Sequence, residues 1–119
     1  MKVPTHKDLD IWKMSISLVK DIYFLTSTFP KEEKYGLITQ MKRAAVSIPS
    51  NISEGAARNS RREYIQFLYI SLGSLSELET QLIIADELDY SSQIGVILEK
   101  IEIIRPKMLT FIHYLKKKN

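Results

Sequence analysis

The chain has 119 residues, of which 45% are hydrophobic and 26% charged, and it carries a net charge of +3. This length and balance predict a single globular domain over residues 1–119 and exclude a disordered chain. The chain contains no cysteine, which excludes disulfides and thiolate chemistry. We expect a cytoplasmic protein without a leader or a membrane-spanning segment, because no apolar run is long enough for either.

The first predicted helix covers residues 9–26, where apolar side chains form two adjacent stripes. At about 100° per residue the two stripes cover roughly half of the helix circumference. One stripe consists of Ile11, Met14, Leu18, Ile22 and Leu25, and the other of Trp12, Ile16, Val19 and Tyr23. A bundle core needs only one of them. The second stripe therefore indicates a subunit interface that includes Trp12, Ile16 and Tyr23, or else it covers the edge of the bundle.

A second helix is predicted from residue 31 to about residue 58, with its apolar side at Ile38, Met41, Ala45, Ile48 and Ile52. It continues through Pro49, where the missing N–H and the small neighbouring residues predict a bend. A polar stripe occupies its other side, formed by Gln40, Arg43, Ser47, Asn51, Glu54 and Arg58. This stripe has two interpretations: it is a polar face that is solvated or lines an interface, or it contacts RNA directly.

The third and fourth helices have the clearest signals. Ser60 and Glu63 have the spacing of a capping box, and an apolar series follows at Ile65, Leu68, Leu72, Leu75, Leu78 and Leu82. After a short polar segment the last helix carries Ile94, Ile97, Ile101, Ile104, Met108, Phe111 and Leu115 on one seam. No segment has the alternation of a strand. Four long helices with short turns predict an all-α fold, an antiparallel up-down-up-down four-helix bundle.

Catalytic and metal-binding residues are not predicted. The two histidines, His6 and His113, lie near the two ends of the chain. Neither has a glutamate three positions before it, which is the spacing that bundles with two metal ions use. The chain also lacks a phosphate-binding loop and a nucleophile elbow. We therefore expect no enzyme, no cofactor and no metal site.

A family resemblance is carried by three segments, PKEEKYGLITQMKRAAVSIPSNISEGAAR, SRREYIQFL and LGSLSELETQL. Its densest part is Gln40, Arg43, Ala44, Ser47, Ile48, Asn51, Ile52, Glu54 and Gly55. The chain resembles the 23S ribosomal RNA intervening-sequence proteins over residues 8–115. That family is in turn similar to the accessory variability determinant of diversity-generating retroelements. The resemblance implies a four-helix bundle, a ring-shaped homopentamer and an association with RNA, without an established biochemical activity.

The predicted topology separates the charges. It brings residues 1–8, 54–63 and 113–119 to one end with a net charge of +5, and residues 24–35 and 84–93 to the other with −3. A basic end attracts the RNA backbone. The candidate RNA-binding residues are Arg43, Arg58, Arg61, Arg62, Lys116, Lys117 and Lys118, and Tyr64 and Tyr114 are the candidates for stacking on bases. The alternative is a protein-interaction scaffold whose terminal lysines serve solubility and the helix dipole.

Overall fold

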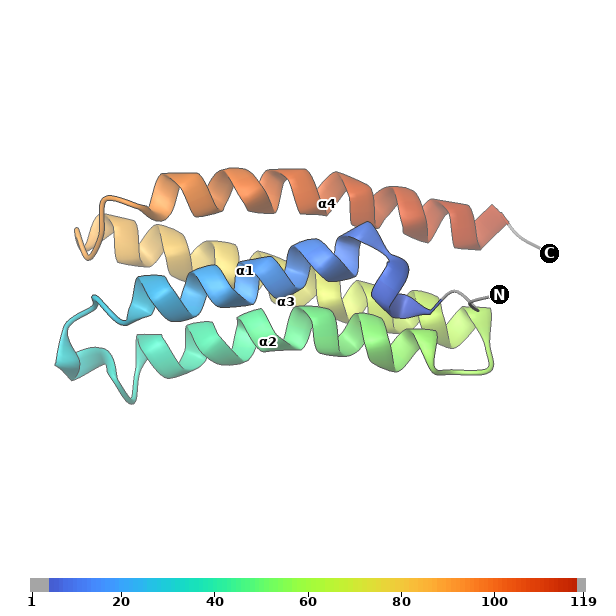
Figure 1. The fold of residues 1–119 in the computed structure, drawn as a ribbon, viewed down its shortest axis with the longest axis horizontal. Coiled ribbons are helices and arrows are strands. Elements are labelled where there is room, and N and C mark those ends of the chain that lie inside the picture. Colours follow the sequence, from blue (N-terminus) through green and yellow to red (C-terminus); the bar gives the residue numbers. More distant parts are fainter. Residues whose placement is uncertain (1–4, 118–119) are drawn as a thin grey trace.

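Four α-helices make up most of the chain (Figure 1): α1 (Asp10–Thr26), α2 (Leu37–Ala56), α3 (Arg61–Glu87) and α4 (Ile94–Lys117). Two short 3₁₀ helices, η1 (His6–Asp8) and η2 (Lys31–Glu33), precede α1 and α2. The computed structural model describes residues 5–117, and it contains no strand in that range. The predicted all-α class is confirmed.

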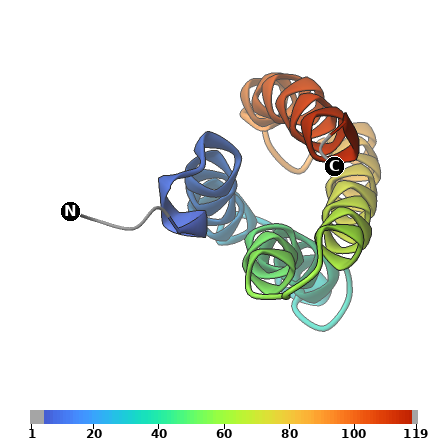
Figure 2. The same cartoon turned by 90° about the vertical axis from the view of Figure 1, so that its right-hand side faces the viewer.

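Successive helices alternate in direction and pack side by side (Figure 1). Seen from the end that holds the α2–α3 turn, the bundle curves round from α1 through α2 and α3 to α4 (Figure 2). The contact between α2 and α3 is the most extensive, and the contact between α1 and α4 is the smallest. The predicted up-down-up-down bundle is thus confirmed, with its loosest seam between the first and last helices.

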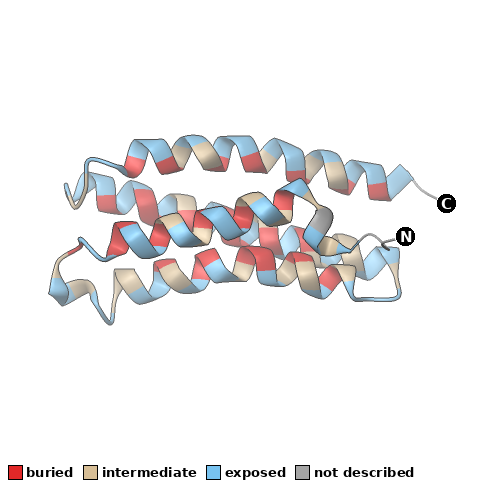
Figure 3. Ribbon diagram, viewed as in Figure 1, coloured by how far each residue is buried: buried red, intermediate tan, exposed pale blue. Residues whose placement is uncertain are grey.

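Buried residues recur along each of the four helices (Figure 3), and most of them are apolar. The largest fully buried side chains are Leu18, Ile22, Met41, Ile48, Ile52, Leu68, Leu75, Leu78, Leu82, Ile94, Ile101 and Ile104. Burying one such side chain stabilises a fold by about 1.5–3 kcal/mol. This shared core fixes how the helix ends lie relative to one another. None of the helices between residues 5 and 117 combines the length and the hydropathy that crossing a membrane requires.

The second helix begins later than predicted. Residues 31–33 form η2, and α2 starts only at Leu37, after Gly36 with φ −117° and ψ −109°. The Glu33 carboxylate accepts a hydrogen bond from the Leu37 N–H at 3.2 Å. Glu33 therefore satisfies a free N–H at the start of α2 from outside the helix, and does not lie in its first turn as the sequence suggested.

The two ends of α3 follow local rules. The Ser60 hydroxyl accepts the Glu63 N–H at 3.2 Å, which confirms the predicted N-cap. At the other end, Asp89 has a φ of 56°. There the Asp89 N–H bonds the Asp86 carbonyl and the Tyr90 N–H bonds the Ala85 carbonyl, both at 3.0 Å. These two bonds form a Schellman motif, which ends the helix and turns the chain toward α4.

The predicted seam of α4 is correct except at one position. Phe111 is only partly buried, whereas Ile112 has an exposed fraction of 1%. Ile112 follows Ile94 by 18 residues, which is about five turns of a straight helix, so both side chains point the same way. A strict heptad pattern drifts from that direction by about 20° per repeat, which places Phe111 beside the core.

Helix α2 runs uninterrupted through Pro49, which is buried. The Pro49 carbonyl accepts a hydrogen bond from the Ser53 hydroxyl at 3.1 Å, and that hydroxyl in turn accepts the indole N–H of Trp12 at 3.1 Å. Ser53 therefore links α1 to the proline-containing turn of α2. The bend expected at this point stays a prediction.

The polar stripe of α2 divides into two environments. In its middle, the Ser47 and Ser74 hydroxyls lie 2.8 Å apart across the α2–α3 contact, and the Asn51 amide donates to the Ser47 carbonyl. The outer members Gln40, Arg43, Glu54 and Arg58 are exposed. The middle of the stripe lines a contact between helices of the same chain because small side chains let α2 and α3 approach closely there.

Candidate nucleic-acid interface

One end of the bundle gathers cationic side chains from three elements. Arg58 follows the end of α2, Arg61 and Arg62 lie in the first turn of α3, and Lys116 and Lys117 lie in the last turn of α4. The α2–α3 turn and the end of α4 lie at the same end of the molecule (Figures 1 and 2). We call this surface the basic end. Lys118 lies outside the described residues.

The helix dipole explains some of these charges and not others. Lys116 and Lys117 stand at the C-terminus of α4, where a positive charge is favourable. Arg61 and Arg62 stand at the N-terminus of α3, where each unfavourable charge costs about 0.3–1 kcal/mol. Among the side chains that the structure describes, none forms an ion pair with Arg58, Arg61 or Arg62. Their charges therefore remain available to an external anion.

Close packing between α2 and α3 positions Arg58. Gly55 lies so near α3 that a Cβ atom there would come within 2.8 Å of Phe67 Cβ and 2.9 Å of Tyr64 Cδ1. The short connection to α3 then places the Arg58 guanidinium carbon 4.9 Å from the centroid of the Phe67 ring. This cation–π contact holds the arginine at the α2–α3 turn while leaving its residue exposed.

A groove of about 530 Å³ runs between the first turns of α3 and the last turn of α4. It is lined by Arg61, Arg62, Ile65, Gln66, Tyr69, Leu115 and Lys116. The Lys116 ammonium donates to the Tyr69 hydroxyl at 2.7 Å. We call this hollow the α3–α4 groove. It combines three cations with an apolar floor and an aromatic ring, all within the basic end.

The two tyrosines predicted for stacking belong to another cluster. Tyr64 is half-buried with its ring edge-on to Phe111 at 5.5 Å, and burial raises its pKa. Tyr114 stacks on Phe111 with ring centroids 6.3 Å apart. The groove instead holds Tyr69, which was not among the candidates predicted from the sequence. Its position seven residues after Arg62, two turns along the same helix face, is the signal that could have identified it.

Arg43 is separate from the basic end. It lies 15 residues before Arg58, which at 1.5 Å per residue is about 22 Å along α2. It lines another hollow together with Tyr23, Thr39, Lys42, Val46 and Ser47. The Lys42 ammonium in that hollow lies 4.7 Å from the centroid of the Tyr23 ring. Arg43 thus shares a surface with Tyr23, a predicted interface residue, and not with the other candidate RNA-binding residues.

The three predicted interface residues lie on the outer side of α1. Trp12 is partly buried and bonded to Ser53, so it also covers the edge of its own bundle. Ile16 and Tyr23 remain 44% and 46% exposed. Trp12 and Ile16 line a shallow groove of about 260 Å³ together with Val19, Val46, Pro49, Ser50 and Ser53. This α1–α2 groove is mainly apolar.

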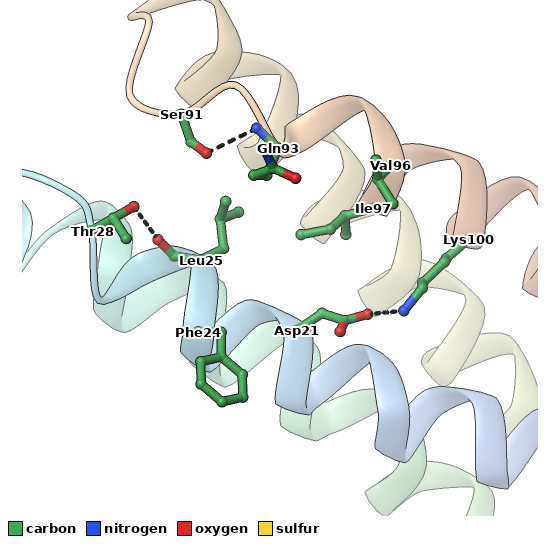
Figure 4. Close-up of a pocket in the computed structure, with 9 residues that line it drawn as sticks. All are labelled: Asp21, Phe24, Leu25, Thr28, Ser91, Gln93, Val96, Ile97 and Lys100. Atoms are coloured by element: carbon green, nitrogen blue, oxygen red, sulfur yellow. Dashed lines mark hydrogen bonds and ion pairs between the residues drawn. The ribbon is translucent and has the colours of Figure 1, made fainter.

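A further hollow of about 270 Å³ lies at the loose seam between α1 and α4 (Figure 4). Its two charged residues, Asp21 and Lys100, form an ion pair with each other across the seam. Phe24 projects away from the hollow. Because its charges neutralise each other, this hollow is a poor site for an anion. No group of three His, Asp or Glu residues that could hold a metal ion occurs in the part of the chain that the structure describes.

Comparison with known proteins identifies the family. The sequence model of the 23S rRNA-intervening sequence proteins matches residues 7–110, which include most of the four helices. The chain belongs to this family. The match confirms the predicted resemblance to the 23S rRNA-intervening sequence proteins, whereas the relation to the retroelement accessory protein stays a prediction.

One solved structure is similar over nearly its whole length. It is a protein of unknown function from the S23 ribosomal protein family of Bacteroides thetaiotaomicron. The two share 22% identity with a TM-score of 0.79, over 87% of this chain and 95% of that one. At this identity the similarity shows a common fold. A comparison with curated proteins finds no match.

Proposed function

We propose that this member of the 23S rRNA-intervening sequence proteins is a non-enzymatic, RNA-associated bundle that binds the phosphate backbone through its basic end. The observation that carries the proposal is the set of three arginines, Arg58, Arg61 and Arg62, at one end with no ion-pair partner among the described residues. Arg61 and Arg62 carry positive charges at the N-terminus of α3, where the helix dipole disfavours them, so the stability of the helix does not explain their presence. The family description supports an association with ribosomal RNA. A location in the cytoplasm is part of this proposal.

The charge distribution supplies the binding mechanism. Each phosphate that a cation neutralises releases condensed counterions, so affinity comes mainly from the number of neutralised phosphates and falls with salt. The acidic end at residues 24–35 and 84–93 repels the same backbone. A molecule with opposite charges at its two ends therefore approaches RNA with its basic end first.

The test removes the three arginine charges together. In filter binding to a structured fragment of ribosomal RNA at several salt concentrations, we expect Arg58→Gln, Arg61→Gln and Arg62→Gln combined to weaken binding. The plot of log K against log salt has a negative slope, and the magnitude of this slope should decrease by about 3. Each arginine that no longer neutralises a phosphate accounts for about 1. A matched control combines Lys20→Gln, Lys31→Gln and Lys34→Gln, which remove the same charge away from the basic end and leave binding unchanged.

Two results would contradict the proposal: no RNA binding at low salt, or equal loss of affinity in both triple variants. Either result would favour the alternative function, a scaffold that binds other proteins. The mainly apolar α1–α2 groove is the observation that supports this alternative.

We also propose that the protein self-associates through the outer side of α1. Half-exposed Ile16 and Tyr23 adjoin an apolar groove, and burying such surface in a second copy is favourable by about 25 cal/mol per Å². The resemblance to the family implies a ring of five. In a ring, the basic ends of all copies would share one rim and increase the attraction for RNA.

Analytical ultracentrifugation tests the assembly. We expect a mass several times the 13.8 kDa of one chain, and dissociation on Ile16→Lys because a charge would enter the interface. Ile103→Lys is the control, since Ile103 on α4 is 50% exposed and lies on another helix. A mass of 13.8 kDa at every concentration would refute self-association.

A further inference from the structure

The α3–α4 groove holds an aromatic ring where attraction for a phosphate backbone alone requires none. Tyr69 is 43% exposed, although it lies in the third turn of a helix that packs on both sides. Its hydroxyl accepts a hydrogen bond from the Lys116 ammonium, which also lies 5.1 Å from the centroid of the ring. This contact crosses from α4 to α3 and restrains the ring at the wall of the groove.

The other groove residues divide by chemistry along its length. Ile65 and Leu115 provide apolar surface, while Arg61 and Arg62 stand at its outer end in the first turn of α3. The rise of a helix places Arg62 about 10 Å from Tyr69 along the axis. A single nucleic-acid strand lying in the groove would thus meet guanidinium groups first, then apolar surface and the tyrosine ring.

Duplex and single-stranded RNA differ in what they can use here. In a duplex the bases are stacked inside, and a protein meets mainly phosphates and sugar hydroxyls. In an unpaired strand the bases are free to stack on aromatic side chains. The arginines serve both ligands equally, whereas the ring of Tyr69 is useful only to an unpaired base.

We propose that the α3–α4 groove binds an unpaired stretch of RNA, with a base stacked on Tyr69 and the adjoining phosphates held by Arg61 and Arg62. This inference rests on the proposed function and extends it from general attraction to a preference for unpaired RNA. Tyr64 does not serve this role because its ring is half-buried against Phe111.

The test compares two probes, a short fluorescein-labelled oligouridine and a blunt RNA duplex with the same number of phosphates per strand. We expect Tyr69→Ala to weaken oligouridine binding by about 5- to 150-fold, the loss that alanine causes at base-stacking positions, and to leave duplex binding unchanged. Tyr69→Phe should retain binding to both probes, because it keeps the ring and removes only the hydroxyl that Lys116 contacts. Tyr69→Leu keeps apolar bulk without an aromatic face, and should behave as Tyr69→Ala does.

The control is a second lysine–tyrosine pair at the acidic end. The Lys34 ammonium lies 5.4 Å from the centroid of the Tyr35 ring, and Tyr35 is 88% exposed. Tyr35→Ala should leave both affinities unchanged. Circular dichroism melting of every variant checks that the bundle remains folded, and the leucine variant preserves the test if alanine destabilises the chain.

The outcomes separate this inference from the proposed function. If the Tyr69 variants bind oligouridine as well as the unmodified protein does, or lose affinity for both probes equally, the groove does not select unpaired RNA. The proposed function then stands, provided that the arginine triple variant still loses affinity. If the unmodified protein binds neither probe at low salt, both proposals fail together.

Discussion

Replacing Gly55 by alanine tests the close approach of α2 and α3 that supports the basic end. The added Cβ would lie 2.8 Å from Phe67 Cβ, 2.9 Å from Tyr64 Cδ1 and 3.2 Å from the Tyr64 carbonyl oxygen. Two of these atoms belong to the backbone of α3 or are attached to it, so a side-chain rotation cannot relieve the overlap. The helices must separate, and overpacking of this kind costs about 1–3 kcal/mol.

Replacing Gly55 by alanine also has a stabilising effect, because alanine favours the helix more than glycine does. The same replacement at Gly73 measures this effect by itself. Alanine in a helix interior is better than glycine by about 0.5–1 kcal/mol. Gly73 lies in α3, and outside its own stretch of helix no atom lies within 4 Å of the position that a Cβ would occupy. Gly73→Ala should therefore stabilise the chain by about 0.5–1 kcal/mol. Gly55→Ala should destabilise it by as much as about 2 kcal/mol, and the two variants differ by the packing cost of about 1–3 kcal/mol.

Thermal and guanidinium unfolding at one fixed protein concentration measures the difference. For a domain of this size 1 kcal/mol corresponds to about 4 °C in Tm. We expect Gly73→Ala to melt a few degrees above the unmodified chain, and Gly55→Ala to melt at its temperature or several degrees below it. If Gly55→Ala raises Tm as much as Gly73→Ala does, the packing between α2 and α3 is looser than the structure indicates.

Two further predictions concern the acidic end. The hydrogen bond from Tyr90 to Glu33 at 2.7 Å raises the pKa of Tyr90, so its stabilising effect is complete below the unfolded value of about 10 and is lost as pH rises through the folded pKa. The difference in guanidinium unfolding between the unmodified chain and Tyr90→Phe should be constant near neutral pH and shrink above about pH 10. Asp89 has a φ of 56°, where glycine is free of Cβ strain, so Asp89→Gly should stabilise the Schellman turn by about 1 kcal/mol and raise Tm; a lowered Tm would refute this.

The sequence determined the features that depend on neighbours within a turn or two. The Ser60 cap, the end of α1 before Pro30 and the apolar stripes that form the core follow from interactions between residues up to four positions apart. The same patterns, with short turns, fix the number and alternating direction of the helices. Two local predictions were wrong. At the start of α2 the negative charges of residues 32 and 33 suggested a helix, and Gly36 separates them from it. In α4 the heptad pattern placed Phe111 on the seam, where Ile112 is buried instead.

Only the tertiary structure decided which residues meet across helices. Lys116 and Tyr69 are 47 residues apart, and their contact depends on the rotation and axial position of α4 against α3. Gly55 and Gly73 both lie inside helices, yet of these two only Gly55 has atoms of another helix within 4 Å of the position that a Cβ would occupy. The periodicity of a helix predicts which of its faces is buried. The rotation of one helix and its axial position against another depend on how side chains interlock along the whole contact. For that reason the sequence predicted a basic end, and the structure alone placed an aromatic groove within it.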